Sequence, residues 1–193
     1  MSAPGVRWPN RALEIIAVAL SLLYTYAYAN GWLWAWYAGI SGSVLFAFLT
    51  YRSGLLAEVG THLFYLLSAV YGWVHQSGKA AQWGLDLPVW IPLSIQEHGV
   101  VIGVCAVVAL GLGRWLSTQP RARTPYFDAQ TTVFSIAATV LMIHFDRSNW
   151  LYWIAIDAAS SVLYVRRGLR LSAGMYVVYT AMALYGAYLA YVH

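Results

Sequence analysis

Two tryptophans and one carboxylate occur at helical spacing in the second half of the chain. Trp150, Trp153 and Asp157 are three and four residues apart, so an α-helix would carry all three side chains on one face. Indole faces attract cations, and a carboxylate accepts hydrogen bonds or pairs with a positive charge. The pattern therefore predicts a pocket for a flat ligand that is cationic or carries hydroxyl groups.

The helix that would position this motif belongs to a chain that is too apolar for an ordinary soluble domain. Of the 193 residues, 61% are hydrophobic and only 9% are charged, whereas about a quarter of the residues of a soluble domain are charged. We therefore expect an all-α integral membrane protein, with residues 1–193 forming a single transmembrane domain. Hydropathy predicts seven transmembrane helices, over residues 12–29, 32–51, 55–75, 96–116, 127–145, 149–166 and 171–191.

The basic residues are distributed unevenly between the two sides of this arrangement. Nine of the 11 Lys and Arg residues fall on one side, and only Lys79 and Arg147 fall on the other. Since short basic loops stay in the cytoplasm, the N-terminus is predicted to be cytoplasmic and the C-terminus to lie outside. The basic residues form no continuous stripe, so no nucleic-acid partner is expected. The nine are Arg7, Arg11, Arg52, Arg114, Arg121, Arg123, Arg166, Arg167 and Arg170.

An internal repeat divides the predicted helices into two sets. Residues 12–73 align without a gap to residues 126–187 at a shift of 114 residues, with thirteen identities over 62 positions; composition alone would give about five. The alignment predicts three-helix repeats at 12–75 and 126–191, with a linker helix at 96–116. Because three is odd, the linker helix makes the two repeats parallel, and such 3+1+3 parallel repeats are typical of transporters.

A second polar face is predicted on the third helix, together with two further aromatic candidates. Glu58, His62 and Tyr65 lie at offsets of four and three residues, so they share one helix face, where they would contact a ligand or satisfy one another. Trp36 is the repeat counterpart of Trp150, although an aromatic belt at the membrane surface also explains it. Tyr164 extends the face of Trp150 on the sixth helix.

Motifs for other chemistry are missing from the sequence. It contains no phosphate-binding glycine loop followed by lysine, no HExxH helix and no GxSxG turn. The single cysteine and the spacing of the histidines favour no metal site, so we expect no metal, no cofactor and no catalytic residues. One alternative is a membrane-embedded enzyme that uses Asp157 with Glu58 or His62 as acid and base. Another is a sugar carrier whose aromatic groove stacks on the sugar.

The motif from Trp150 to Asp157, followed by Arg166-Arg167-Gly168-Leu169, resembles the WxxWxxx(N/D) signature of the PnuC-type vitamin transporters. Its last position is Asp here, where Asn also occurs in the family. The resemblance covers nearly the whole chain, from Ala12 to Tyr191, and the 3+1+3 repeat is similar to a full-length SWEET-like fold. It also rests on the segments Tyr51–Ala57, Tyr71–Trp73 and Asp128–Ser135.

The resemblance implies a function as well as a fold. It implies a bacterial inner-membrane transporter that takes up nicotinamide riboside by facilitated diffusion and alternating access, with cytoplasmic phosphorylation trapping the vitamin. Thiamine or riboflavin is the alternative substrate, and the charge of Asp157 does not choose between nicotinamide riboside and thiamine, since both are cations. Trp150, Trp153 and Asp157 would surround the vitamin, with Tyr164 and the third helix as additions. The implied partners are this small molecule and the lipid membrane, and a homo-oligomer is left open.

Overall fold

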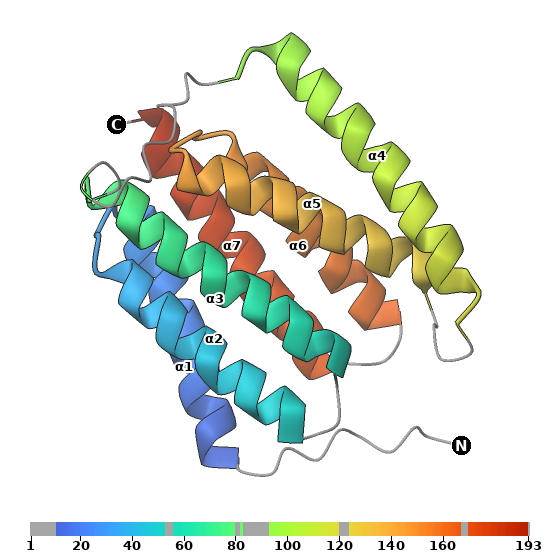
Figure 1. Cartoon of the computed structure of the whole chain (residues 1–193), viewed down its shortest axis with the longest axis horizontal. Coiled ribbons are helices and arrows are strands. Elements are labelled where there is room, and N and C mark those ends of the chain that lie inside the picture. Colours follow the sequence, from blue (N-terminus) through green and yellow to red (C-terminus); the bar gives the residue numbers. More distant parts are fainter. Residues whose placement is uncertain are drawn as a thin grey trace. The chain divides into compact units, whose positions relative to one another are not determined.

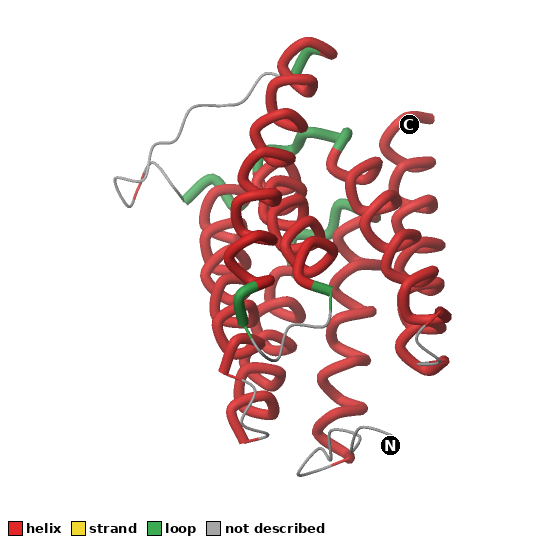
Figure 2. Tube along the Cα trace, turned by 90° about the vertical axis from the view of Figure 1, so that its right-hand side faces the viewer, coloured by secondary structure: helices red, strands yellow, loops and turns green. Residues whose placement is uncertain are grey.

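The computed structural model describes residues 11–52, 56–79, 82, 93–119, 124–166 and 170–192. These residues form seven α-helices, and the loops between them are drawn in Figures 1 and 2. The expected all-α fold with seven helices is confirmed. Most of the long connection between the third and fourth helices, including Trp83 and Trp90, lies outside the described residues.

The chain divides into two compact units, Met1–Leu87 and Pro88–His193. The first unit contains α1 (Arg11–Ala29), α2 (Ala35–Arg52) and α3 (Leu56–Gln76), and α2 packs against both of the others. A small residue lets α1 and α2 approach each other: a Cβ atom at Gly39 would lie 2.9 Å from the ring of Tyr24.

The second unit contains α4 (Ile95–Ser117), α5 (Pro125–Ile143), α6 (Asn149–Arg166) and α7 (Arg170–Val192), and each helix packs against the next. The start of α4 is determined by a capping box. The Ser94 hydroxyl accepts a hydrogen bond from the Glu97 N–H at 3.3 Å, and the Glu97 carboxylate accepts one from the Ser94 N–H at 2.7 Å. These bonds satisfy backbone donors that the helix itself leaves unpaired.

The apolar character of the helices supports a protein that crosses the membrane several times. Among the described residues, four segments are long and apolar enough to span a bilayer: Ala12–Ala29, Ile95–Ser117, Pro125–Ile143 and Ala173–Val192. α3 and α6, which carry His62 and Asp157, are not among them. Ionisable side chains lower the hydropathy of a spanning helix and often mark functional positions.

Helix bounds repeat along the chain with the shift that the sequence alignment gave. The bounds of α5 and α6 are those of α1 and α2 moved by 114 residues, and α7 begins 114 residues after α3. The predicted repeat ranges, 12–75 and 126–191, remain a prediction that this regularity supports.

The same turn ends the first helix of each set. Gly31 and Phe145 have positive φ angles of 71° and 61°, and the N–H of the next residue donates to the carbonyl five residues before it, at 3.0 Å for Trp32 and 2.9 Å for Asp146. This is the Schellman motif. Because Gly31 to Trp34 form this turn, α2 begins at Ala35, later than the predicted residue 32.

Candidate functional site

Trp150, Trp153 and Asp157 lie on α6, whose bounds are those predicted. Trp150 is 6% exposed, Asp157 is 7% exposed, and Trp153 is half-buried. Their spacing places them on one face of the helix, which we call the motif face.

Asp157 is buried in this face and has no partner among the residues that the structure describes. None of the residues that the structure describes donates a hydrogen bond to its carboxylate or forms an ion pair with it. A buried, unpaired carboxylate in a membrane helix is costly. The position therefore favours a ligand that brings a positive charge or a hydrogen-bond donor.

Trp150 is held between α6 and α7 by a close approach to a glycine. A Cβ atom at Gly186 would lie 2.6 Å from Cε2 of the Trp150 indole, which is far inside van der Waals contact. Only glycine leaves room for the ring at this point, so Gly186 determines where the indole lies.

Trp36 occupies the corresponding position in the first unit, where its partners come from α1 and α3. The side chain is 1% exposed and lies against Gly72 of α3. Its indole N–H donates to Oε1 of Gln76 at 3.1 Å, and the ring centroids of Tyr24 and Tyr28 lie 5.6 Å and 5.7 Å from its own. Trp36 stays a predicted site residue, with its N–H already bonded within its own unit.

The second unit has smaller side chains where the first has these partners. The residues 114 positions after Tyr24, Tyr28 and Gln76 are Ala138, Met142 and Ala190, none of which carries a ring or a polar side chain. The surroundings of Trp150 therefore differ from those of Trp36, although both indoles rest on a glycine.

The predicted polar face of α3 is partly described. The imidazole of His62 stacks on Phe46 of α2, with ring centroids 5.0 Å apart and an interplanar angle of 10°. Tyr65 lies next to His62, at 6.3 Å between centroids. The side chains of Glu58 and Tyr164 lie outside the described residues, so the predicted pairing of Glu58 with His62 stays a prediction.

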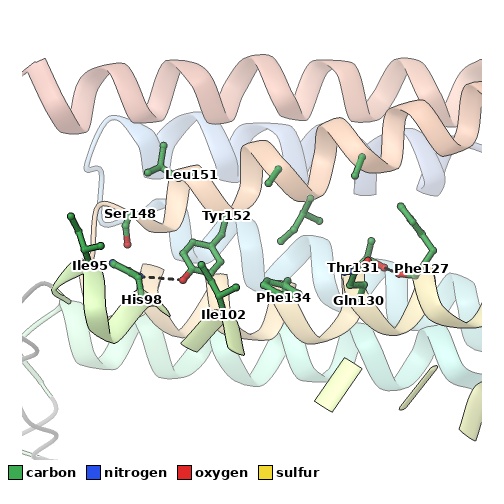
Figure 3. Close-up of a pocket in the computed structure, with 13 residues that line it drawn as sticks. Ile95, His98, Ile102, Phe127, Gln130, Thr131, Phe134, Ser148, Leu151 and Tyr152 are labelled. Carbon is green, nitrogen blue, oxygen red and sulfur yellow. Dashed lines mark hydrogen bonds between the residues drawn. The ribbon is translucent and has the colours of Figure 1, made fainter. Parts of the chain in front are cut away.

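A polar cluster that the sequence did not single out lies at the turn between α5 and α6. Oδ1 of Asp146 accepts hydrogen bonds from the N–H and the hydroxyl of Ser148, at 2.8 Å and 2.5 Å. Oδ2 accepts the N–H of Leu93 at 3.0 Å and lies 3.9 Å from Nε2 of His98. Nδ1 of His98 is 3.1 Å from the hydroxyl of Tyr152, as Figure 3 shows. The cluster joins the start of α4 to α6.

These contacts determine the protonation of Asp146. Burial by itself would raise the pKa of this carboxyl group, but the hydrogen bonds from Ser148 and Leu93 and the nearby His98 imidazole outweigh it. The pKa of Asp146 therefore lies below its usual value. The local signal in the sequence was an Asp followed two residues later by Ser, which is typical of a turn closed by a carboxylate.

Replacing Asp146 with asparagine is expected to destabilise the protein at neutral pH by about 1.5–3 kcal/mol, because hydrogen bonds to a charged acceptor are lost. A lowered folded-state pKa stabilises the protein above the unfolded pKa of about 3.9, and this contribution is lost as pH falls through the folded value. Thermal unfolding in detergent at pH 7 and over a pH series that extends well below about 3.9 measures both effects, with Asp128→Asn as the control. An unchanged unfolding temperature in the Asp146 variant would contradict the role of the cluster.

A cavity of about 540 Å³ lies next to the cluster, between α4, α5 and α6. Its wall on α6 includes Tyr152, which is labelled in Figure 3, together with Ala155 and Ala159. At about 100° per residue these positions point away from the motif face. The cavity, which we call the α4–α5 cavity, is therefore separate from the predicted site on Trp150 and Asp157.

Comparison with known proteins identifies the family. A family model described as nicotinamide mononucleotide transporter matches residues 11–190. The chain belongs to this family. Since its members are transporters, the protein is a membrane transporter that crosses the bilayer several times, and the alternative of a membrane-embedded enzyme loses its support.

Individual relatives of this transporter agree with the expected PnuC-type membership. Nicotinamide riboside transporter PnuC of Escherichia coli is 24% identical over 198 residues, which cover 91% of this chain and 83% of the relative. The riboflavin/roseoflavin transporter RibM of Streptomyces davaonensis is 26% identical over 149 residues, covering 76% and 68%. A crystal structure of the vitamin B3 transporter PnuC shares the fold, with a TM-score of 0.67, 23% identity and coverage of 94% of this chain and 81% of the other.

Proposed function

We propose that this transporter carries nicotinamide riboside across the bacterial inner membrane. The observation that carries the proposal is the buried carboxylate of Asp157, without a partner among the described residues, on the same helix face as Trp150 and Trp153. A pyridinium ring is flat and positively charged, so it would stack on an indole and compensate the charge of Asp157. The name of the Escherichia coli relative supports the same substrate.

The riboside fits this face better than its phosphorylated form, which the family description names. A phosphate monoester adds about two negative charges near neutral pH, and like charges at close range are unfavourable in a medium of low dielectric constant. The described part of the motif face carries Asp157 and no basic residue. We therefore propose the nucleoside, not the nucleotide, as the transported species.

Transport would proceed by alternating access without a coupling ion. The vitamin binds when the motif face is open to the outside and leaves when it is open to the cytoplasm, and cytoplasmic phosphorylation then traps it. Tyr164, Glu58, His62, Tyr65 and Trp36 are proposed as further contacts. The excess of basic residues on one side favours a cytoplasmic N-terminus and a C-terminus outside.

Riboflavin is a second candidate substrate because RibM is among the relatives. The isoalloxazine ring is also flat and would stack on tryptophan, but it is neutral and would leave Asp157 without a cation. Thiamine carries a positive charge and remains an alternative on that ground. Isothermal titration of the detergent-purified protein with these three vitamins and with nicotinamide mononucleotide separates the candidates. Binding of riboflavin or thiamine, with no heat from nicotinamide riboside, would contradict the proposed substrate.

Uptake of labelled nicotinamide riboside into liposomes that contain the purified protein is expected to continue when an uncoupler and a sodium ionophore remove both ion gradients. The reason is that facilitated diffusion depends on the vitamin gradient alone. Vesicles preloaded with unlabelled riboside should accelerate entry of the labelled compound by exchange. Uptake that stops with the proton gradient, in the absence of any kinase, would show that transport is ion-coupled.

Replacing Asp157 with asparagine separates charge from hydrogen bonding at the proposed site. If the carboxylate compensates the pyridinium charge, the variant loses the attraction between the two charges. We expect it to lose at least about 1.4 kcal/mol of binding free energy, so that it binds nicotinamide riboside at least tenfold more weakly. Binding of neutral riboflavin should not fall in parallel. Titration of both vitamins measures the contrast, and an unchanged affinity for the riboside would mean that only the hydrogen bond matters.

A further inference from the structure

The α4–α5 cavity has a defined end where two helices of the second unit meet. A Cβ atom at Gly113 on α4 would lie 2.5 Å from Cδ1 of Tyr126 on α5, so the helices touch there. They separate toward the start of α4 (Figure 1). At that other end Nδ1 of His98 lies 3.1 Å from the hydroxyl of Tyr152 on α6, so a polar contact borders the cavity there.

Apolar side chains line the middle of the cavity, and polar side chains lie toward its two ends. Ile102 of α4, Phe134 of α5 and Ile156 of α6 line the middle. His98, Ser148 and Tyr152 gather at the end beside the α5–α6 turn, and Gln130 and Thr131 of α5 lie toward the other end (Figure 3). Arg147, next to Ser148 in that turn, is exposed. The cavity therefore has an apolar middle, and its end beside the α5–α6 turn, which we call the mouth, is polar.

The length of the cavity matches one leaflet of a bilayer. The lining on this side runs from Ser148, directly before α6, to Ala159 on α6, which is about 16 Å at 1.5 Å per residue. The hydrocarbon core of a bilayer is about 30 Å thick, so each leaflet contributes about half of that. Because the cavity starts at a turn between two helices, its polar mouth lies near a membrane surface.

We propose that the α4–α5 cavity binds one acyl chain of a membrane phospholipid, with the phosphate of the same lipid near Arg147. Hydrocarbon matches the apolar middle of the cavity and its direction along the helices. Arg147, which is exposed in the adjoining turn, would complement the phosphate. The lipid would fill the gap between α4 and α5 and so hold α4 in place.

Photo-crosslinking tests this proposal on the full chain in liposomes. The probe is a phosphatidylglycerol with a diazirine in one acyl chain, and mass spectrometry locates the adducts. Labelling is expected to concentrate on cavity residues such as Ile102, Phe134 and Ile156, and an excess of unlabelled phosphatidylglycerol should suppress it. Labelling spread evenly over the exposed faces of α4 to α7, without saturation, would overturn the proposal.

Matched variants identify the binding determinants. Ala155→Phe fills the cavity from α6 and is expected to remove most of the adducts, whereas Ala181→Phe, at an exposed position on α7 outside the cavity, should leave them unchanged. Circular dichroism and gel filtration verify that both variants fold. Equal labelling of the two, or cross-links that join two copies of the chain through the cavity, would contradict a lipid site.

A second pair of measurements tests the phosphate contact and needs no cavity-filling variant. Arg147→Gln is expected to lower labelling by the phosphatidylglycerol probe but not by a diacylglycerol with the same diazirine chain. An equal response of the two probes would rule out the phosphate contact. Since no vitamin is present, these results are independent of the proposed transport of nicotinamide riboside.

Discussion

Replacing Trp153 with alanine is expected to weaken binding of nicotinamide riboside by about 1–3 kcal/mol, the range found when aromatic side chains that stack on bases are removed. At about 1.4 kcal/mol for each factor of ten, the dissociation constant should rise roughly 5- to 150-fold. Trp153 is half-buried on the motif face of α6, so part of its side chain is accessible to a ligand. Isothermal titration of the purified protein measures the change.

The matched control is Trp115→Ala, which removes an indole that is 60% exposed on α4. This variant should retain the affinity of the wild type. If both variants bind normally, Trp153 does not stack on the vitamin. If both weaken to the same degree, the loss reflects a general destabilisation and not a contact with the ligand.

The other large effect is expected at Gly186. Gly186→Ala places a methyl group where the Trp150 indole lies, 2.6 Å from Cε2, and overpacking of this kind costs about 1–3 kcal/mol. Either α7 moves away from α6 or the indole leaves its position. We therefore expect a lower unfolding temperature together with weaker vitamin binding, measured on the same detergent-purified sample.

Gly174→Ala on the same helix is the control for Gly186→Ala. A Cβ atom at Gly174 meets no atom within 4 Å, and alanine is a better helix former than glycine by about 1 kcal/mol. This variant should be as stable as the wild type or more stable, with normal binding. Similar behaviour of the two variants would mean that the close contact between Gly186 and Trp150 is not important for the protein.

Hydropathy and helical spacing were sufficient to predict the seven helices and the motif face on α6, because both depend on residues that are close in the sequence. The predicted start of α2 was too early because the residues between the Schellman turn at Gly31 and Ala35 are apolar. Hydropathy therefore assigned them to the helix. The repeat alignment predicted which residues correspond, but not that Trp36 would find Tyr24, Tyr28 and Gln76 as partners.

The Asp146 cluster and the α4–α5 cavity could not be predicted in the same way. The cluster joins Leu93 and His98 to residues about fifty positions later, Asp146 and Tyr152. The cavity depends on how far α4 diverges from α5 between Gly113 and the start of α4. Both the cluster and the cavity are consequences of how helices pack in three dimensions. No local pattern of residues encodes the angle between α4 and α5.

The glycine beneath Trp150 limits how this half of the molecule can move. With the indole enclosed between α6 and α7 and no side chain at Gly186 to yield, the ring cannot change rotamer unless the two helix axes separate. The helices α6 and α7 should therefore move as one rigid body during each transport cycle. A disulfide engineered between α6 and α7 should therefore leave turnover intact.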